Sequence, residues 1–154
     1  MKLSGTSIVP VPQERVYALL QDPAVLARCM PGCEGLDPIG EGEYAMRMKM
    51  AIASMSGLFQ GKVKVGDQNP PNSFRLIVEG SGKIGFMKGD GVLHLSANSP
   101  ETTVKFEGDV QVGGTMAAVG QRLMETTAKM LIKRFFDRLN AEAAQSGAAG
   151  SPIA

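Results

Sequence analysis

A regular alternation of apolar and polar side chains runs through the middle of this chain and limits the folds that it can adopt. Between Val104 and Val112 every even position is apolar or glycine, and every odd position is charged or polar. The same alternation recurs around Val63 and around Leu76. Side chains in a strand point alternately to opposite faces of a sheet, so each segment has one apolar and one polar face. The pattern predicts an antiparallel sheet with one buried and one solvated face.

Turn-forming residues divide the chain into elements. Residues 2–9 are predicted to form a strand, and Pro12 can open a short helix after it. Asp22 and Pro23 predict the start of a second short helix, because Asp is a good N-cap and Pro fits the first helical position. About six further strands are predicted between residues 33 and 113, separated by Gly-, Asn- and Pro-rich turns.

Seven glycines lie inside these predicted strands. Glycine in a strand marks bends, bulges and places where two backbones approach closely, so we expect a strongly curved sheet. The glycines are Gly61, Gly80, Gly82, Gly85, Gly89, Gly91 and Gly108.

Residues 115–143 are predicted to form one long helix with Thr115 as its N-cap. Its apolar stripe consists of Met116, Val119, Leu123, Met130, Leu131, Phe135 and Leu139. A curved sheet with one apolar face, followed by such a helix, predicts that the sheet wraps around the helix. The fold class is therefore α+β, with one domain over residues 1–143 and a flexible tail of small residues at 144–154.

Methionines replace the usual β-branched residues on one face of a predicted strand. Met46, Met48 and Met50 alternate with Arg47 and Lys49, so the three thioethers share a face. Thioether side chains can repack around varied apolar shapes. A methionine-filled core would explain any one of them, but three in a row, in a chain with 10 Met and no Trp, predict an adaptable apolar pocket. The predicted lining, with Tyr44 and Thr127 as its polar groups, is Met30, Tyr44, Met46, Met48, Met50, Phe59, Phe74, Val104, Phe106, Met116, Leu123, Met124 and Thr127.

Composition argues against several classes of function. The formal net charge of +1 provides no field that would attract nucleic acid. No stretch approaches the ~18 apolar residues of a membrane span. The first residues lack the apolar core and cleavage site of a signal peptide, so we expect a cytoplasmic protein.

The reactive residue types do not form a recognisable catalytic or metal-binding motif. Cys29 and Cys33 are the only two cysteines, and a metal site would need further ligands, whereas the one histidine, His94, is far along the chain. In a reducing compartment we expect two free thiols beside a turn. No acid–base or nucleophilic constellation is found, which predicts a protein that is not an enzyme and needs no cofactor.

Basic residues gather on the face of the last helix opposite its predicted apolar stripe. A solvated helix face explains them, and a docking surface for an acidic partner or for anionic lipid headgroups is the functional alternative. The residues are Arg122, Lys129, Lys133, Arg134 and Arg138.

Several segments together resemble the family of the G subunit of carbon monoxide dehydrogenase, which belongs to the START-like (SRPBCC) superfamily. They are the opening Met-Lys-Leu-Ser-Gly, the Cys-Met-Pro-Gly-Cys-Glu run at residues 29–34, and Val-Gly-Gly at 112–114 followed by Gly120. The resemblance covers residues 1 to about 143. It implies a helix-grip fold, in which a sheet of about seven strands and a long C-terminal helix enclose a ligand cavity.

The resemblance also implies a function. Members accompany molybdenum hydroxylases such as carbon monoxide dehydrogenase, which implies a non-catalytic accessory role. The implied ligand is a quinone or a lipid, and the implied partners are the hydroxylase polypeptides, with recruitment to the membrane. A ligand-free interaction or maturation factor, and a cyclase-type enzyme on the same fold, remain as alternatives, because fold does not determine function.

Overall fold

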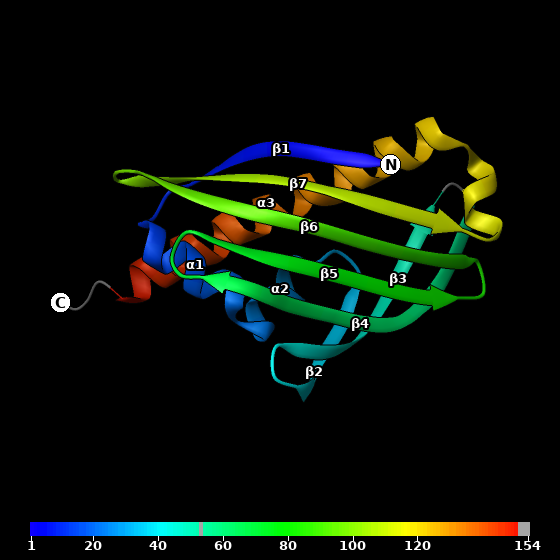
Figure 1. Ribbon diagram of the computed structural model, residues 1–154, viewed down its shortest axis with the longest axis horizontal. Helices are drawn as coiled ribbons and strands as arrows, with labels where there is room; N and C mark the ends of the chain where they lie inside the picture. The colour runs from blue at the N-terminus through cyan, green and yellow to red at the C-terminus, as the bar shows by residue number, and fades with distance from the viewer. Residues whose placement is uncertain (53, 151–154) are drawn as a thin grey trace.

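The computed structural model describes residues 1–52 and 54–150, with burial of side chains defined up to residue 145. The described residues form one antiparallel sheet in the order β1-β7-β6-β5-β4-β3-β2, which curves around the long helix α3 (Figure 1). The elements are β1 (Lys2–Val9), α1 (Gln13–Gln21), α2 (Pro23–Cys29), β2 (Cys33–Gly40), β3 (Glu43–Ile52), β4 (Met55–Asn69), β5 (Ser73–Gly82), β6 (Gly85–Asn98), β7 (Glu101–Gly113), the 3-10 helix η1 (Thr115–Val119) and α3 (Gln121–Gly150).

The two short helices form where the sequence predicts them. Asp22 is the N-cap of α2, and its side chain accepts a hydrogen bond from the backbone N–H of Ala24 at 2.9 Å. Pro23 occupies the first turn, where a missing N–H has no cost. Pro12 stands at the N-cap of α1 instead of inside the helix.

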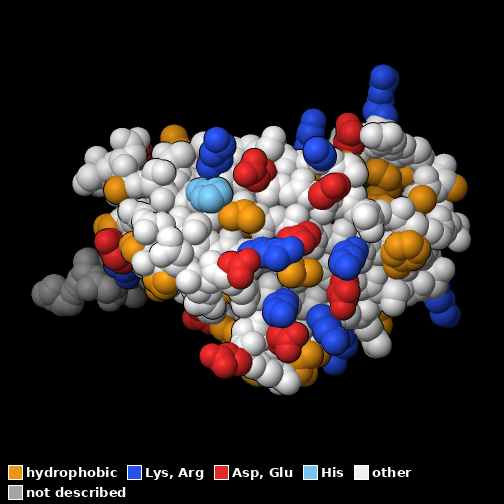
Figure 2. Space-filling model, in the orientation of Figure 1, with side chains coloured by type: hydrophobic (Ala, Val, Ile, Leu, Met, Phe, Trp, Pro, Cys, Tyr) orange, Lys and Arg blue, Asp and Glu red, His pale blue; other side chains and the backbone are white. Residues whose placement is uncertain are grey.

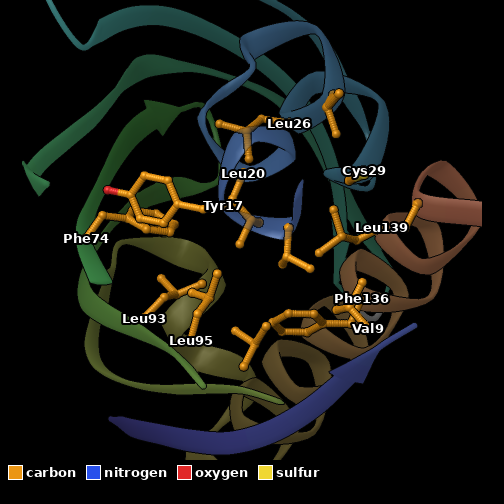
Figure 3. Close-up of a cluster of buried hydrophobic side chains, with 14 of the residues drawn as sticks. Val9, Tyr17, Leu20, Leu26, Cys29, Phe74, Leu93, Leu95, Phe136 and Leu139 are labelled. Atoms are coloured by element: carbon orange, nitrogen blue, oxygen red, sulfur yellow. The ribbon is translucent and has the colours of Figure 1, made fainter. Parts of the chain in front are cut away.

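One end of the space between sheet and helix is filled by a hydrophobic core. Side chains of α1, α2, the strands and α3 point toward one another there (Figure 3). Tyr17 of α1 packs edge-on against Phe74 of β5, with ring centroids 5.7 Å apart. Arg28 of α2 donates hydrogen bonds to both carboxylate oxygens of Glu142, which ties α2 to α3. This end of the molecule is therefore solidly packed.

The prediction of one helix over residues 115–143 is wrong. Gly114 and Gly120 have φ of +82° and +97°, a region that only glycine adopts without strain. The chain therefore forms the separate 3-10 helix η1 between them, and Gly114 takes the N-cap place predicted for Thr115. α3 extends to Gly150, past the predicted end, while the last residues of the predicted tail, 151–154, lie outside the described residues.

Glycine pairs on the inner face allow the sheet to bend. Gly61 of β4 is paired with Gly80 of β5, and Gly91 of β6 is paired with Gly108 of β7. A Cβ atom at Gly61 would overlap the backbone carbonyl oxygen of Glu79, and one at Gly108 would lie 2.9 Å from the carbonyl oxygen of Asp90. The strand backbones approach closely at these pairs, as the many strand glycines predict.

Substitution of Gly61 tests whether the glycine pair permits the curvature. We expect Gly61→Ala to lower the free energy of unfolding by about 2–3 kcal/mol, because two strand backbones must separate to admit the methyl group. Gly66→Ala is the matched control in the same strand, since a Cβ there meets nothing within 4 Å. Its effect should stay within about 0.5 kcal/mol in urea unfolding. Equal effects of the two changes would contradict the role of the glycine pair.

Candidate functional site

A cavity of about 310 Å³ lies between the inner face of the sheet and α3. Its volume falls at the lower end of the range of small-molecule sites. Each described element except β2 contributes to its wall: β1, α1, α2, β3 to β7, η1 and α3. The cavity adjoins the packed core, with which it shares Leu20, Leu26, Phe74, Leu93 and Phe136.

The cavity lies over inward positions of the sheet that are occupied by glycine. Gly89 and Gly91 of β6 and Gly108 of β7 occupy inward positions in the middle of the sheet, and all three line the cavity. On the opposite wall α3 presents Ala128. A Cβ at Gly89 would meet only Val110, at an ordinary 3.6 Å, so the space above Gly89 is open. The sheet and helix therefore stand apart where no large side chain bridges them.

Methionine dominates the lining. Seven of the 10 methionines contribute to the wall, and the same seven belong to, or pack against, the second buried hydrophobic cluster. They come from four strands or their flanks, from η1 and from α3, so thioethers surround the space instead of covering one wall. The seven are Met1, Met30, Met48, Met50, Met87, Met116 and Met124.

The cavity offers almost no polar group to a ligand. Among the described residues, no Lys, Arg or His lines it, and Thr127 of α3 is the one lining side chain with a hydroxyl group. Asp90 contributes to the wall, but its carboxylate is paired with Arg75 on the outer face of the sheet, where the Nε–Oδ1 distance is 2.8 Å. Glu107 and Asp109 also touch the wall, and both are exposed.

The predicted site residues fall into three groups. Those that line the cavity are Met30, Met48, Met50, Phe74, Phe106, Met116, Met124 and Thr127. Tyr44, Met46, Phe59 and Val104 do not line it: the last three are buried in the core, and Tyr44 packs against the core from the sheet. Leu123 is 39% exposed and points to solvent. Contact of any of them with a ligand stays a prediction.

Two physical causes explain why some of the predicted residues lie outside the cavity wall. The break at Gly120 starts a new helical phase, so Leu123 does not continue the stripe that begins at Met116, and Met130 is likewise exposed. Met46 shares a face with Met48, but its methyl group lies over the glycine pair, 3.3 Å from where a Cβ of Gly80 would be. It fills the bend of the sheet instead of facing the cavity.

Met87 also lines the cavity and was not among the predicted residues, although the sequence holds a signal for it. Met87 alternates with Phe86 and Lys88, and the next inward positions of β6 are glycines. A strand whose inner face is formed by one Met and then two Gly was not recognised as a cavity wall. Leu131, Ile132 and Phe135 of α3 line the cavity as well and were not predicted to do so.

Both cysteines are free thiols, and their surroundings suppress the reactive thiolate. Burial raises the pKa of Cys29 to about 11, and Glu142 adds to this rise. Burial also raises the pKa of Cys33, whose thiol lies 3.6 Å from the carbonyl oxygen of Gly35. Neither cysteine lines the cavity. The thiols are therefore poor nucleophiles at neutral pH.

The basic residues of α3 are exposed, as predicted, and lie outside the cavity. Lys133 forms an ion pair with Asp137 at 2.9 Å, one turn further along the helix. Such a pair between exposed side chains contributes little to stability. Binding of a partner or a membrane by Arg122, Lys129, Lys133, Arg134 and Arg138 stays a prediction.

Neither a metal site nor a membrane-spanning helix is found in the part of the chain that the structure describes. Within residues 1–52 and 54–150, no cluster of three or more His, Cys, Asp and Glu side chains is suited to hold a metal ion. No helix among the same residues has the length and apolarity to cross a membrane. His94 is exposed on β6.

Comparison with known proteins gives a consistent result. The model of the CoxG family, described as the G subunit of carbon monoxide dehydrogenase, matches residues 5–144. A conserved protein from Geobacillus kaustophilus of known structure is 34% identical, with a TM-score of 0.91 over 95% of this chain and 97% of that one. No curated protein matches the sequence.

More distant structures share the fold alone. A START superfamily protein from Mycobacterium smegmatis is 17% identical, with a TM-score of 0.71 over 94% of this chain and 97% of that one. The Zhui aromatase/cyclase from Streptomyces sp. R1128 is 13% identical, with a TM-score of 0.69 over 99% of both chains. The predicted START-like fold is confirmed.

Filling the cavity from Gly89 tests whether it is a binding space. We expect Gly89→Leu to leave the fold intact and to reduce affinity for the neutral apolar dye N-phenyl-1-naphthylamine at least ~10-fold, or ~1.4 kcal/mol. Lys88→Leu is the control, because it adds the same side chain one residue away on the outer face. Dye fluorescence measures both. Unchanged binding by Gly89→Leu would place the dye elsewhere.

The pKa of Cys29 predicts its reactivity. With a pKa of about 11, only about 1% of the thiol is ionised at pH 9. In a Cys33→Ser variant we therefore expect slow alkylation by iodoacetamide at pH 7, rising about tenfold for each pH unit up to pH 9. Mass spectrometry follows the reaction, with the urea-unfolded protein as the fast control. Rapid alkylation of the folded variant at pH 7 would contradict the effect of burial on this thiol.

Proposed function

The chain belongs to the CoxG family, the family of the G subunit of carbon monoxide dehydrogenase, and on this basis we propose that it is a non-catalytic carrier of an uncharged hydrophobic molecule. The ligand is a quinone or a lipid, held between the sheet and α3. The observation that supports this proposal best is the cavity itself: about 310 Å³ of methionine-lined space, with no cationic side chain among the described residues of its wall. The carrier serves a molybdenum hydroxylase, with cytoplasmic location and peripheral contact at the inner face of the membrane.

The lining supports a neutral ligand over a charged one. A carboxylate or phosphate inside the cavity would find no Lys, Arg or His to pair with in the described wall. Burying an unpaired ion costs several kcal/mol, so a charged headgroup would have to remain outside. Thr127 can form a hydrogen bond with one carbonyl or hydroxyl group of the ligand. This combination favours a neutral molecule with a single polar group in the cavity.

The same lining supports a carrier over the two alternatives. A cyclase would need polar groups that converge on a reacting atom. Of the polar side chains in the described wall, Asp90 is paired with Arg75 and both Glu107 and Asp109 are exposed, which leaves the hydroxyl of Thr127. A pure interaction or maturation factor would have no use for an open space, and its cavity would be filled by side chains. The exposed cations of α3 are the surface that we propose for contact with the hydroxylase or with anionic lipid headgroups.

A matched pair of dyes tests the charge of the ligand. N-phenyl-1-naphthylamine and 8-anilinonaphthalene-1-sulfonate share one aromatic framework and differ by a sulfonate group. We expect the neutral dye to bind at least ~30-fold more tightly, because the sulfonate would be buried without a counterion. Fluorescence titration measures both dissociation constants. Equal affinities of two dyes that compete for the cavity would contradict the neutral-ligand proposal.

Two neighbouring residues of β3 test the location of the site. Met48 lines the cavity, whereas Arg47 is exposed on the opposite face. We expect Met48→Glu to abolish binding of the neutral dye and of a long-chain quinone, and Arg47→Glu to leave binding unchanged. Circular dichroism verifies the fold of each variant. Unchanged binding by a folded Met48→Glu would show that the ligand does not contact β3.

A further inference from the structure

β1 is the last strand at one edge of the sheet, the upper edge in Figure 1, and among the described strands it pairs only with β7. A groove of about 280 Å³ lies between this strand and α3. Five consecutive residues of β1, Leu3 to Ser7, line the groove. Because alternate side chains of a strand point to opposite faces, a groove that touches five residues in a row must follow the edge of the strand. The groove therefore lies against the backbone of β1.

Every second peptide group of β1 points away from β7. The backbone N–H of Val110 donates to the carbonyl oxygen of Met1 at 2.8 Å, and the amine of Met1 donates to the carbonyl oxygen of Val110 at 2.9 Å. Such doubly bonded pairs recur at every second residue of an antiparallel ladder, so the odd-numbered positions of β1 bond β7. The even-numbered positions present their N–H and C=O groups to the free edge, and no hydrogen bond to these groups is found among the described residues. Three of these positions are Ser4, Thr6 and Ile8.

The two edges of the sheet differ in their protection against a further strand. β2, at the other edge, contains Pro38 and two acidic residues, and its register with β3 shifts at two places. Proline, charge and bulges are devices that prevent pairing at a sheet edge. β1 has none of them between Leu3 and Val9, and its 8 residues pair with β7 without a shift. β1 is therefore the edge that can accept another strand.

Aromatic rings form the floor of the groove. Phe106 of β7 and Phe136 of α3 line it, and their rings stack with centroids 5.5 Å apart. A Cβ atom at Gly5 would lie 2.7 Å from Cζ of Phe106, so this ring reaches up to the backbone of β1. Ile132 of α3 adds further apolar surface. A strand in the groove would bury its own apolar side chains on this floor.

The groove also contains a cation without an acidic partner. Lys129 and Lys133 of α3 line it, and Lys133 is paired with Asp137 at 2.9 Å. No ion pair of Lys129 is found in the described part of the chain. The outer face of the sheet differs, because Figure 2 shows Lys and Arg next to Asp and Glu there, as Arg75 is next to Asp90. The groove therefore favours an occupant with an acidic side chain.

We propose that β1 is the docking site for an extended, acidic segment of a partner protein, which adds to the sheet as a further strand. The backbone of the segment bonds the free N–H and C=O groups of Ser4, Thr6 and Ile8, as in other cases of strand addition. Its apolar side chains contact the aromatic floor, and an acidic side chain pairs with Lys129. This interface concerns a protein partner and goes beyond the carriage of a ligand.

Two labelled peptides test the chemistry of the partner. Both have the length of β1, 8 residues; one alternates Val with Glu, and the other alternates Val with Lys. In fluorescence anisotropy we expect the Glu peptide to bind ~5-fold more tightly at low ionic strength, where exposed charges are least screened. Lys129→Glu should abolish this preference, whereas Lys83→Glu, in the exposed β5–β6 turn, should preserve it. Equal binding of the two peptides to the wild-type protein would overturn the acidic partner.

Thr6→Pro tests strand addition. Proline removes the N–H that points to the free edge but leaves the bonds to β7, so an edge strand tolerates it. We expect the variant to keep its circular dichroism spectrum and to lose at least ~10-fold in affinity for the Glu peptide. Thr6→Val, which keeps the N–H, is the matched control and should bind like the wild-type protein. Equal affinities of the two variants would overturn strand addition.

Amide hydrogen exchange tests the same interface in the unaltered protein, whether or not the proline variant folds. In the free protein we expect fast exchange at Ser4, Thr6 and Ile8, and slow exchange at Gly5 and Ser7, which bond β7. A saturating amount of the Glu peptide should slow exchange at the first three. Absence of peptide binding, or a bound peptide that leaves these three amides in fast exchange, would overturn the proposal.

A second copy of this chain is the competing occupant. β1 contains no acidic residue that would pair with Lys129 of another copy, so we expect the wild-type protein to sediment as a monomer. A dimer that Thr6→Pro converts into a monomer would replace the partner protein by a second copy.

The interface and the carrier function fail separately. We expect Gly89→Leu to lose the neutral dye and to keep the Glu peptide. If the wild-type protein binds the dye but not the peptide, only the interface fails. If it binds the peptide with protection of the β1 amides but binds no neutral apolar molecule, only the carrier function fails.

Discussion

The curvature of the sheet is the constraint on which the rest of the structure depends. A seven-stranded sheet has one apolar face to bury, and in this chain a single long helix must cover most of it. The sheet can surround α3 only because two pairs of glycines, Gly61–Gly80 and Gly91–Gly108, let strand backbones approach without side chains between them. At Gly91 and Gly108 the absent side chains also leave the cavity between the sheet and the helix, whereas Met46 lies over the Gly61–Gly80 pair. Fold and cavity thus have one origin.

The two ends of the molecule differ in the elements and side chains that fill them. At one end α1 and α2 fill the sheet with a packed core, and Arg28 and Glu142 join α2 to α3 (Figure 3). At the other end the described chain forms no second layer of helix, and methionines and the thin segment η1 close the space. Both ends are packed, since Ile52, Phe59 and Val63 belong to a second buried cluster, but this second end is the one rich in thioethers, which can repack around a ligand.

Most of the fold could be predicted from the sequence, whereas the site could be predicted only in part. Alternation identifies strands and their inner face, and Asp22 with Pro23 marks a helix start, because both signals are local. Alternation cannot tell which inward residue faces the core and which faces a cavity, since that depends on the distance to α3: Met46 and Met48 share a face and differ in role. Leu123 was predicted to face inward on the assumption of one continuous helix, but the helix is interrupted at Gly120. The spacing of apolar residues gives no sign of this interruption.

The cavity formed around Gly89 also has an evolutionary consequence. A side chain is absent at this position, and a Cβ added there meets only Val110, at an ordinary 3.6 Å. Relatives could therefore change the size of the ligand they accept by single substitutions, without compensating changes elsewhere. Gly91 and Gly108 cannot vary in this way, because the backbone of the neighbouring strand occupies the space that a side chain would need. Selection can thus retune the ligand at one position while the curvature that makes the fold stays fixed at the others.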